Sequence, residues 1–329
     1  MRNNMLKFTL CVLRKIHHIL TPQKNENATE QYKQYTGYVE MWDQDANDYV
    51  YQLLESGLPC MISKFGTTEL FFLTSHLGTL QNKYTFKDYK DFITEKRPNL
   101  WWPVKLTTLV KASGFFPNDS RLLASFYDEY LPAIKNVDVL GSYMKDESKF
   151  AVELKNAKRV NLDGYYAPFY YNNPWTKALK GKKVLVIHPF SDDIERQYAK
   201  REQLWKNQEI LPDFKLITYR SVQSLFGVCD EFETWFDALN KMKEDISKID
   251  YDIALIGCGA YGMPLASFVK DMGKQAIHLA GWTQVLFGIY GTRWLDNPRI
   301  RSFINDSWIR PSKNNKPKNA EKVENGCYW

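Results

Sequence analysis

The sequence has few cysteines: only five among 329 residues, far apart along the chain. An odd number without close spacing indicates no disulfide framework, and the absence of a Cys-x-x-Cys or Cys/His cluster indicates no zinc site. The cysteines therefore predict a reducing compartment, and we expect a cytoplasmic protein. We also find no internal repeat.

Long uninterrupted apolar runs are missing as well. The apolar residues of the segment Met5–Leu20 are interrupted by basic ones, namely Lys7, Arg14, Lys15, His17 and His18. No small-residue cleavage site follows, so we predict neither a signal peptide nor a membrane-spanning helix. The pattern fits either a helix lying on the inner face of a membrane or an amphipathic helix docked on the domain. We assign residues 1–33 to this helix and a polar linker.

Strong charge of either sign is also absent. The chain has 44 Lys and Arg against 38 Asp and Glu, a net charge of +6 that is scattered along the sequence. This is too mild and too mixed to indicate nucleic-acid binding, and it favours anionic substrates or anionic lipid only slightly. Apolar residues make up 44% and aromatic residues 15%, enough for a substantial core. The length allows one large domain or two smaller ones.

Short aliphatic runs alternate with amphipathic helices through the second half of the chain. The expected strands are Pro59–Ser63, Val184–Ile187, Leu216–Thr218, Tyr251–Ile256 and Gln275–Leu279. Successive strand–helix steps predict an α/β fold, with a mostly parallel Rossmann-like sheet and flanking helices.

An aromatic-rich helical insertion is expected between Lys87 and Tyr143. It contains two aromatic–proline groups, Trp101-Trp102-Pro103 and Phe115-Phe116-Pro117. These side chains either line a cleft for a sugar or an acceptor, or pack in the core, which is the commoner use of such residues.

A complete G-x-G-x-x-G turn, Gly257–Gly262, stands between a predicted strand and a predicted helix, Met263–Met272. The start of such a helix is a ready phosphate site. A dinucleotide site would also need an acid about twenty residues further on, but that strand ends in Ile277-His278-Leu279. We therefore expect a nucleotide diphosphate ahead of NAD(P). Alternatively, the glycines only permit a tight turn and close helix packing.

A second polar turn, Lys64-Phe65-Gly66-Thr67-Thr68-Glu69, follows the first predicted strand. Parallel α/β sheets carry functional groups at the carboxyl ends of their strands. Both turns should therefore open on the same edge of the sheet, with Glu69 facing the glycine turn across one cleft. Because an acid in the first turn of a helix also suits the helix dipole, Glu69 has a purely structural alternative.

These two segments together resemble the bacterial GT-D glycosyltransferases of surface-polysaccharide and glycoprotein glycosylation systems. Ile62–Leu70 is similar to that family's Arg-aromatic-Gly-Asp-Gly-Glu stretch. Ile253–Gly281 is similar to its late strand, glycine turn, helix and G-x-Q-A-I strand, which here is Gly273–Ile277. With Val184–Phe190 as a central strand, the resemblance covers roughly residues 37 to 295 by motif order.

The resemblance implies transfer of a sugar from a nucleotide-diphosphate sugar to a glycan or lipid-linked glycan acceptor. It also implies a divalent ion on an Asp-x-Glu pair, for which Glu69 matches the Glu while Thr67 stands in place of the Asp. One carboxylate and one hydroxyl would hold Mg²⁺ or Mn²⁺ more weakly than two carboxylates. Lys64 matches the leading Arg, and His278 matches the Asp after the last strand.

Glu69 is the first candidate for catalysis, as a metal ligand or as a general base. His188, at a strand end, is either a general base for the acceptor hydroxyl or a side chain that holds a loop. The residues expected to bind the nucleotide sugar are Lys64, Gly66, Thr67, Thr68, Arg201, Gly257, Gly259, Tyr261, Gly262, His278 and Gln284.

The catalytic domain is expected to span residues 34–308, followed by a tail over 309–329. The stretch Pro311–Lys318 has a disordered composition, whereas the aromatic Tyr328 and Trp329 predict that the end of the tail docks on the domain.

Two functions from other classes compete with the transferase. The first is a catalytically inactive GT-D-like protein that binds a sugar nucleotide or a partner, favoured by Thr67. The second is an NAD(P)-dependent oxidoreductase, favoured only by the glycine motif.

Overall fold

The computed structural model describes residues 2–21, 38–224, 226–315, 326 and 328. The described residues form one sheet of seven parallel strands in the order β3-β2-β1-β7-β6-β4-β5. The strands are β1 Cys60–Ser63, β2 Val139–Ser142, β3 Lys158–Asn161, β4 Lys183–Ile187, β5 Lys215–Tyr219, β6 Ile253–Ile256 and β7 Gln275–His278. The predicted α/β class with a parallel Rossmann-like sheet is therefore confirmed.

Alternate residues of each central strand pack on opposite sides of the sheet. In β4, Leu185 and Ile187 belong to one apolar cluster, whereas Val184 and Val186 belong to another. Strands that are buried on both faces are expected to be almost entirely apolar, as β4 and β6 are. The two clusters give the molecule three layers, with helices on both sides of the sheet.

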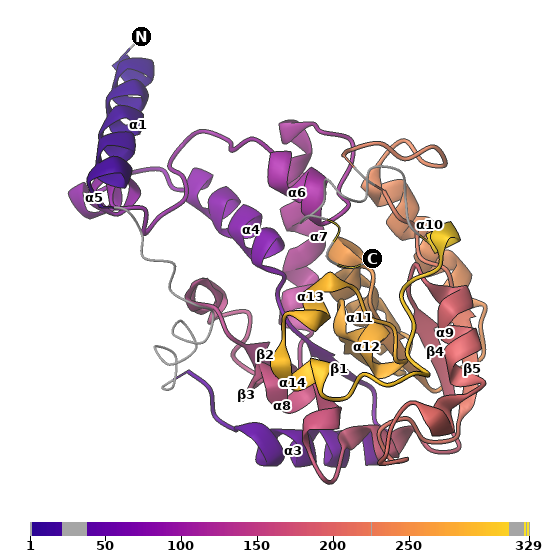
Figure 1. Ribbon diagram of the computed structural model, residues 1–329. Helices are drawn as coiled ribbons and strands as arrows, with labels where there is room; N and C mark the ends of the chain where they lie inside the picture. The colour runs from indigo at the N-terminus through magenta and orange to yellow at the C-terminus, as the bar shows by residue number, and fades with distance from the viewer. Residues whose placement is uncertain (1, 22–37, 225, 316–325, 327, 329) are drawn as a thin grey trace.

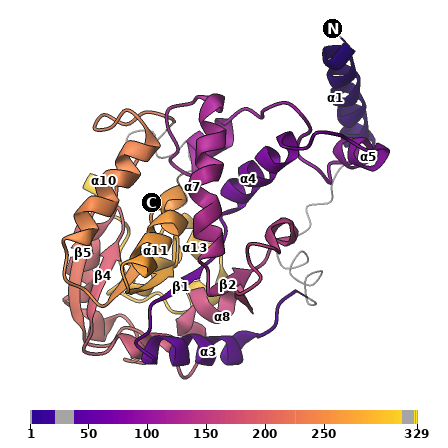
Figure 2. The ribbon, with the colours of Figure 1, turned by 180° about the vertical axis from the view of Figure 1, so that it is seen from behind.

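Two sets of helices cover the sheet. Figure 2 shows α7, α10 and α11 in front of it, and Figure 1 shows α12, α13 and α14 in front of the opposite face. The first set is α4 Thr67–Thr79, α6 Thr107–Ala112, α7 Leu123–Lys135, α10 Trp235–Ser247 and α11 Gly262–Asp271. The second set is α3 Asp43–Glu55, α8 Leu162–Tyr166, α9 Ser191–Tyr198, α12 Trp282–Leu286, α13 Thr292–Leu295 and α14 Pro298–Arg301.

The two aromatic–proline groups pack inside the protein. Phe115 and Phe116 are buried in the cluster under α7 and α10. Trp101 and Trp102 meet edge to face, and Trp102 also packs against Phe92. None of these four side chains lines the main cavity described below, so packing accounts for them.

A small separate unit consists of α1 Arg2–Leu20 and α5 Phe86–Ile93 (Figure 1). Leu10 of α1 is buried beside Phe92, and Arg14 Nη1 donates a hydrogen bond to the Arg97 carbonyl over 2.9 Å. Among the described residues, no helix combines the length and the apolarity needed to cross a bilayer. Most of the predicted linker that follows α1 lies outside the described residues.

The start of the C-terminal tail is ordered, contrary to what its composition predicts. The backbone amide of Ser312 and the side-chain amide of Asn315 both donate to Asp193 Oδ2, over 2.8 and 2.7 Å. Because Asp193 is fully buried, its carboxylate needs such donors, and it fixes this part of the tail. The rest of the Pro311–Lys318 stretch lies outside the described residues.

Glu147 lies at the carboxyl end of β2 and is fully buried. Its carboxylate accepts hydrogen bonds from the Ser142 hydroxyl and from the backbone amides of Tyr143 and Met144, over 3.1 and 3.0 Å for the two amides. Burial nevertheless raises the pKa of Glu147 to about 7, against an ordinary value of 4.5. At a pH between these two pKa values, the folded chain holds a proton on Glu147 that the unfolded chain has lost. The free energy of unfolding therefore falls as the pH rises through this range.

We predict that Glu147→Gln removes this loss of stability, because glutamine keeps the shape and cannot ionise. Its amide can accept from the Tyr143 or Met144 amide and donate to Ser142. As the pH rises from about 5 to about 8, the free energy of unfolding of the variant, minus that of the wild type, should increase by up to roughly 3 kcal/mol. Urea denaturation across this range measures the difference, and two parallel curves would contradict the prediction.

Candidate functional site

A cavity of about 430 Å³ opens at the carboxyl edge of the sheet. It lies where β1, β4, β6 and β7 end and where α4, α9, α11 and α12 begin. After β4, the chain continues to β5 at the edge of the sheet. After β6, the neighbour of β4, it continues in the opposite direction to β7. The order of the strands therefore changes direction between β4 and β6. Such a change of direction is the usual place of a ligand crevice in an α/β sheet.

Most of the residues predicted to form a site line this one cavity. They are Lys64, Gly66, Thr67, Thr68, Glu69, His188, Gly257, Gly259, Tyr261, His278 and Gln284. The expectation that Glu69 and the glycine turn share one cleft is therefore confirmed. The chemical roles of these residues remain predictions.

Arg201 was predicted to bind the nucleotide sugar, and this placement is wrong. Its guanidinium lies 2.9 Å from the Asp213 carboxylate and stacks over Tyr198, away from the cavity lining. The expected helix Ile194–Trp205 ends at Tyr198 as α9. The chain turns there, and Trp205 packs into the core with its indole N–H donating to the Leu286 carbonyl.

The three glycines of the turn are needed by the protein itself. A side chain at Gly257 would come within 2.5 Å of Thr283 Oγ1, and one at Gly262 within 2.2 Å of His278 Nε2. Gly259 has a φ of +58°, and a side chain there would lie 2.9 Å from the Ser113 carbonyl oxygen. Gly262 itself does not line the cavity. A larger residue at Gly259 would thus disturb the fold as well as any ligand.

Two hydrogen bonds from other elements hold the glycine turn in place. The Tyr130 hydroxyl of α7 donates to the Ala260 carbonyl over 2.5 Å, and the Ala260 amide donates to the Ser113 carbonyl over 3.1 Å. The turn is therefore rigid where it faces the cavity, and the start of α11 is fixed with it.

Glu69 is the third residue of α4, and its side chain is only 7% exposed. Its carboxylate folds back over Gly66, so closely that a side chain at Gly66 would lie 1.8 Å from Oε2. Among the described residues we find no hydrogen-bond donor to this carboxylate. The carboxylate lines the cavity and is available there to a ligand.

Lys64 brings positive charge to the same wall. Its ammonium donates to the Phe65 carbonyl over 3.2 Å and lies 5.6 Å from the centre of the Tyr143 ring. Burial lowers the pKa of Lys64, the charge of Glu69 opposes this shift, and Arg293 adds to it. Lys64 and Arg293 together with the starts of α4 and α11 make this region attractive to an anion.

His188 is buried at the end of β4. Its Nδ1 accepts a hydrogen bond from the Phe190 backbone amide over 3.0 Å, so the neutral ring carries its proton on Nε2. Burial lowers the pKa of His188 to about 3, and Asp193 opposes this shift only in part. The geometry favours a hydrogen-bond donor over the predicted general base.

His278, at the end of β7, joins the two halves of the site. Its Nδ1 lies 3.1 Å from Ser63 Oγ of β1, and Gly262 packs directly over the ring. Burial lowers the pKa of His278 to about 3. A neutral ring at this strand end offers no carboxylate for the ribose of a dinucleotide.

Some of the buried polar atoms without hydrogen-bond partners lie at the cavity. Among the described residues they include Ser221 Oγ, Tyr261 Oη, His278 Nε2 and Trp294 Nε1 of the cavity lining, and Thr283 Oγ1 next to Gly257. Most buried polar atoms in proteins have partners, so each of these atoms needs an explanation. It fits a ligand rich in hydroxyl groups or a bound layer of water.

An aromatic wall faces the polar turns. The rings of Tyr166 and Trp282 lie 4.2 Å apart, and those of Trp282 and Trp294 lie 4.9 Å apart. Tyr328 approaches Gly281, and Arg293 Nη1 donates to its hydroxyl over 2.7 Å. This contact agrees with the expectation that the end of the tail docks on the domain. Cys327 and Trp329 lie outside the described residues.

The residues of this wall and Arg293 were not predicted from the sequence. Trp282 had a usable signal, because it follows the end of the predicted strand Gln275–Leu279 by three residues. Arg293 and Trp294 reach the cavity because the chain folds back over it after α12, and no local pattern indicates this. The aromatic Tyr328 predicts docking on the domain, but not its place at the cavity.

Among the described residues, no group of three His, Cys, Asp or Glu side chains could hold a metal ion. Glu69 and Thr67 both line the cavity and are the side chains that the predicted Mg²⁺ or Mn²⁺ would use. A hard cation there would take its other ligands from phosphate oxygens or water. The metal remains a prediction.

A scan against protein-family models, a search of curated proteins and a search of solved structures found no match to this chain. The resemblance to the GT-D glycosyltransferases therefore remains a prediction.

We predict that Gly66→Ala impairs ligand binding by displacing the Glu69 carboxylate. The φ of Gly66 is −76°, so alanine fits the backbone, and the clash falls on the movable end of the Glu69 side chain. Stability should therefore change little. Calorimetric titration with Mn²⁺ and a nucleoside diphosphate measures the effect.

A double-mutant cycle provides the control. If Gly66 acts only through Glu69, Gly66→Ala should have no further effect in a Glu69→Ala background. Equal losses of affinity in both backgrounds would show that Gly66 serves the site in another way.

Proposed function

We propose that this chain is a glycosyltransferase that uses a nucleotide-diphosphate sugar and a glycan acceptor, either free or linked to lipid. The main support is the setting of Glu69, a carboxylate without a hydrogen-bond donor among the described residues, in a cavity that also holds Lys64 and the glycine turn. An anion site, an acid without a partner and an aromatic wall are the parts that such a reaction needs.

The diphosphate of the donor would lie between the glycine turn and Lys64. The start of α11 and the ammonium of Lys64 both favour negative charge there, and Arg293 adds a second cation. Trp282 and Tyr166 offer flat faces for the base or the sugar.

In the reaction, the acceptor hydroxyl oxygen forms a bond to the anomeric carbon of the sugar. The bond from that carbon to the diphosphate breaks, and the nucleoside diphosphate leaves with the electron pair. Glu69 would take the proton of the hydroxyl, or would help to hold a divalent cation, in which case the leaving diphosphate would take the proton. Lys64 and Arg293 would act mainly on the leaving diphosphate, where negative charge grows in the transition state.

A catalytically inactive binding protein is the second candidate. It is favoured by Thr67, which stands where the resemblance implies a carboxylate, and by the lack of a three-ligand group among the described residues. Such a protein would bind the nucleotide sugar in the same cavity without transferring it. An NAD(P)-dependent oxidoreductase has less support, because β7 ends in the buried His278 rather than in an acid.

Nucleotide sugars should raise the melting temperature more than dinucleotides do. UDP-, GDP- or dTDP-linked sugars at about 100 times their Kd would add about 2.7 kcal/mol to the free energy of unfolding. For a chain of this size that corresponds to several degrees in Tm. A thermal-shift panel with and without Mn²⁺ measures this, and stabilisation by NAD(P) alone would reject the transferase.

Glu69→Gln should reduce transfer by at least about 100-fold while the fold remains intact. The change keeps the shape of the side chain and removes its charge. Release of nucleoside diphosphate in the presence of an acceptor reports transfer, and Glu55→Gln, on the exposed end of α3, is a matched control. Wild-type protein that binds a nucleotide sugar but releases no product with any acceptor would support the inactive binding protein.

Thr67→Asp distinguishes the two roles of Glu69. If Glu69 holds a metal, a second carboxylate should tighten Mn²⁺ binding. If Glu69 is only a base, Mn²⁺ affinity should stay unchanged in both Thr67→Asp and Glu69→Gln.

A further inference from the structure

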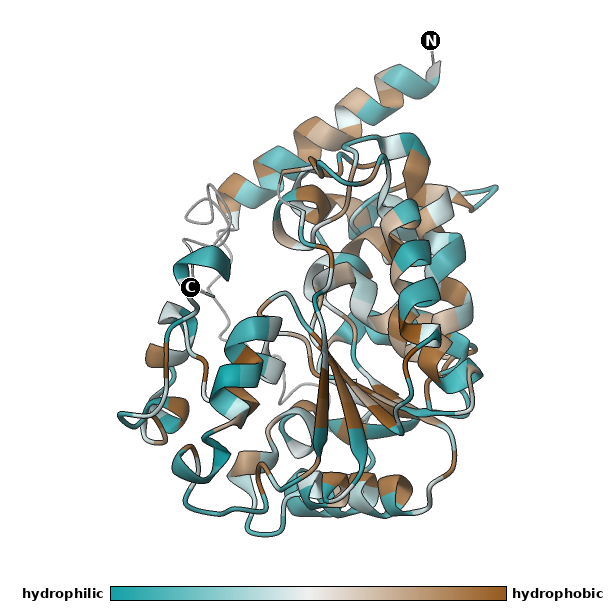
Figure 3. Ribbon diagram, turned by 90° about the vertical axis from the view of Figure 1, so that its right-hand side faces the viewer, coloured by the Kyte–Doolittle hydropathy of each residue, from teal (hydrophilic) through white to brown (hydrophobic). Residues whose placement is uncertain are grey.

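Helix α1 presents its apolar residues to solvent. Phe8 is 71% exposed and Leu20 is 76% exposed. With 3.6 residues per turn, five exposed apolar side chains form one stripe along the helix, and three more lie beside it. The stripe is Met5, Phe8, Val12, Ile16 and Ile19, and its neighbours are Leu6, Leu13 and Leu20. Figure 3 shows that α1 projects from the rest of the molecule with apolar residues along its length.

The side of α1 that faces the protein is mainly basic. Arg14 donates to the Arg97 carbonyl, and its guanidinium lies 4.6 Å from the centre of the Phe92 ring. The ammonium of Lys7 lies 5.3 Å from the centre of the Trp102 ring. Among the described residues of α1, Leu10 is the one apolar residue that is buried in this contact. An amphipathic helix that served only to cover the domain would face the other way.

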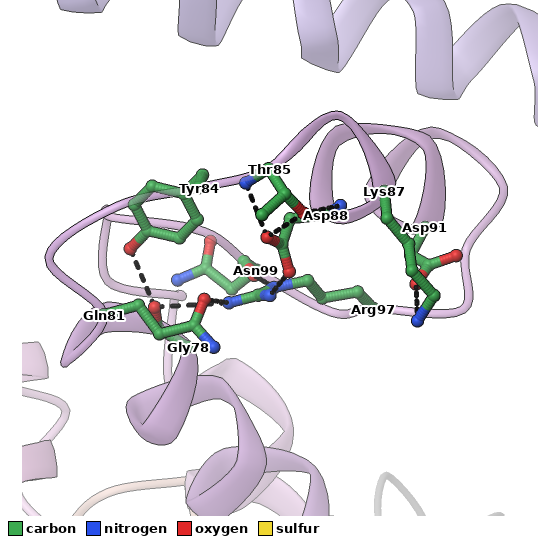
Figure 4. A network of polar contacts seen from close by, with 9 residues as sticks. All are labelled: Gly78, Gln81, Tyr84, Thr85, Lys87, Asp88, Asp91, Arg97 and Asn99. Carbon is green, nitrogen blue, oxygen red and sulfur yellow. Dashed lines mark hydrogen bonds and ion pairs between the residues drawn. The ribbon is translucent and has the colours of Figure 1, made fainter.

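The surface beneath α1 is itself well fixed, as Figure 4 shows. The guanidinium of Arg97 binds Asp88, the Asn99 carbonyl over 2.7 Å and Gln81 Oε1 over 2.9 Å. Asp88 also completes a capping box at the start of α5 with Thr85. Because both the docked side and its support are held by specific contacts, the outward direction of the apolar stripe is a property of the fold.

We propose that α1 docks on an anionic lipid bilayer, lying in its plane with the apolar stripe among the acyl chains. Residues 1–25 contain no Asp or Glu, and Lys15 is exposed on the helix. A helix with an apolar face, basic residues and no acid binds anionic membrane surfaces through both burial and charge. The helix is not apolar enough to cross the bilayer, so it rests at the interface. This inference does not depend on the proposed transferase activity.

A second copy of the chain fits the stripe less well. Pairing two α1 helices would bring the exposed Lys15 of each helix toward its partner, and no acid of residues 1–25 would compensate. Anionic headgroups supply the missing negative charge. Charge complementarity therefore favours the bilayer.

Vesicle co-sedimentation of the full chain tests the proposal. Wild-type protein should bind vesicles of phosphatidylcholine and phosphatidylglycerol more tightly than vesicles of phosphatidylcholine alone, and salt should weaken the binding. Phe8→Ser with Ile19→Ser should weaken it at least about tenfold, because both side chains would leave the acyl chains. The matched control is Leu58→Ser with Val152→Ser, which removes two exposed apolar side chains away from α1 and should bind as the wild type does.

Three results would overturn the proposal. They are a wild-type protein that does not bind the anionic vesicles, a stripe variant that binds them as tightly as the control, and dimers in light scattering that only the stripe variant abolishes. The last result would assign the stripe to a second copy. Equal melting temperatures of the two double variants exclude unfolding as the cause of any loss.

Discussion

The parallel pairing of β1 with β7 is the constraint on which the cavity depends. The two strands are more than 200 residues apart in the sequence, yet Ile62 pairs with Ile277 in the centre of the sheet. Their carboxyl ends therefore lie side by side, with Ser63 against His278. This register places the turn that carries Glu69 next to the turn that carries the glycines. A slip of one residue would turn every side chain of the strand to the other face.

Around this edge the protein leaves several polar groups without partners. Some buried carboxylates elsewhere are fully paired, as the three hydrogen bonds to Glu147 and the several to Asp193 illustrate. At the cavity, Glu69 accepts no hydrogen bond from the described residues, and His278 Nε2 has no partner among them. Groups held in this way reduce stability and leave their hydrogen-bonding capacity for something that enters the cavity.

Much of the fold could be predicted because its signals are local. Apolar runs such as Val184–Ile187 predict buried parallel strands, and the two turns that follow strands predict one shared edge. The aromatic wall and Arg293 could not be predicted, since they depend on where the chain returns after α12. Arg201 was misplaced because a helical pattern continues past Tyr198, whereas burial of Trp205 turns the chain away. Likewise, composition alone does not reveal that the buried Asp193 holds Ser312 and Asn315.

Helix α4 has a consequence for the geometry of the whole molecule. It begins at Thr67 in the cavity and ends at Thr79, next to Gly78, whose carbonyl accepts a hydrogen bond from Tyr84 of the segment that supports α1. Thirteen residues at a rise of about 1.5 Å make α4 about 20 Å long. A chain resting on a bilayer through α1 would thus hold its cavity at a set height above the lipid. If the proposed acceptor is anchored in that bilayer, it would have to extend from the lipid to the cavity.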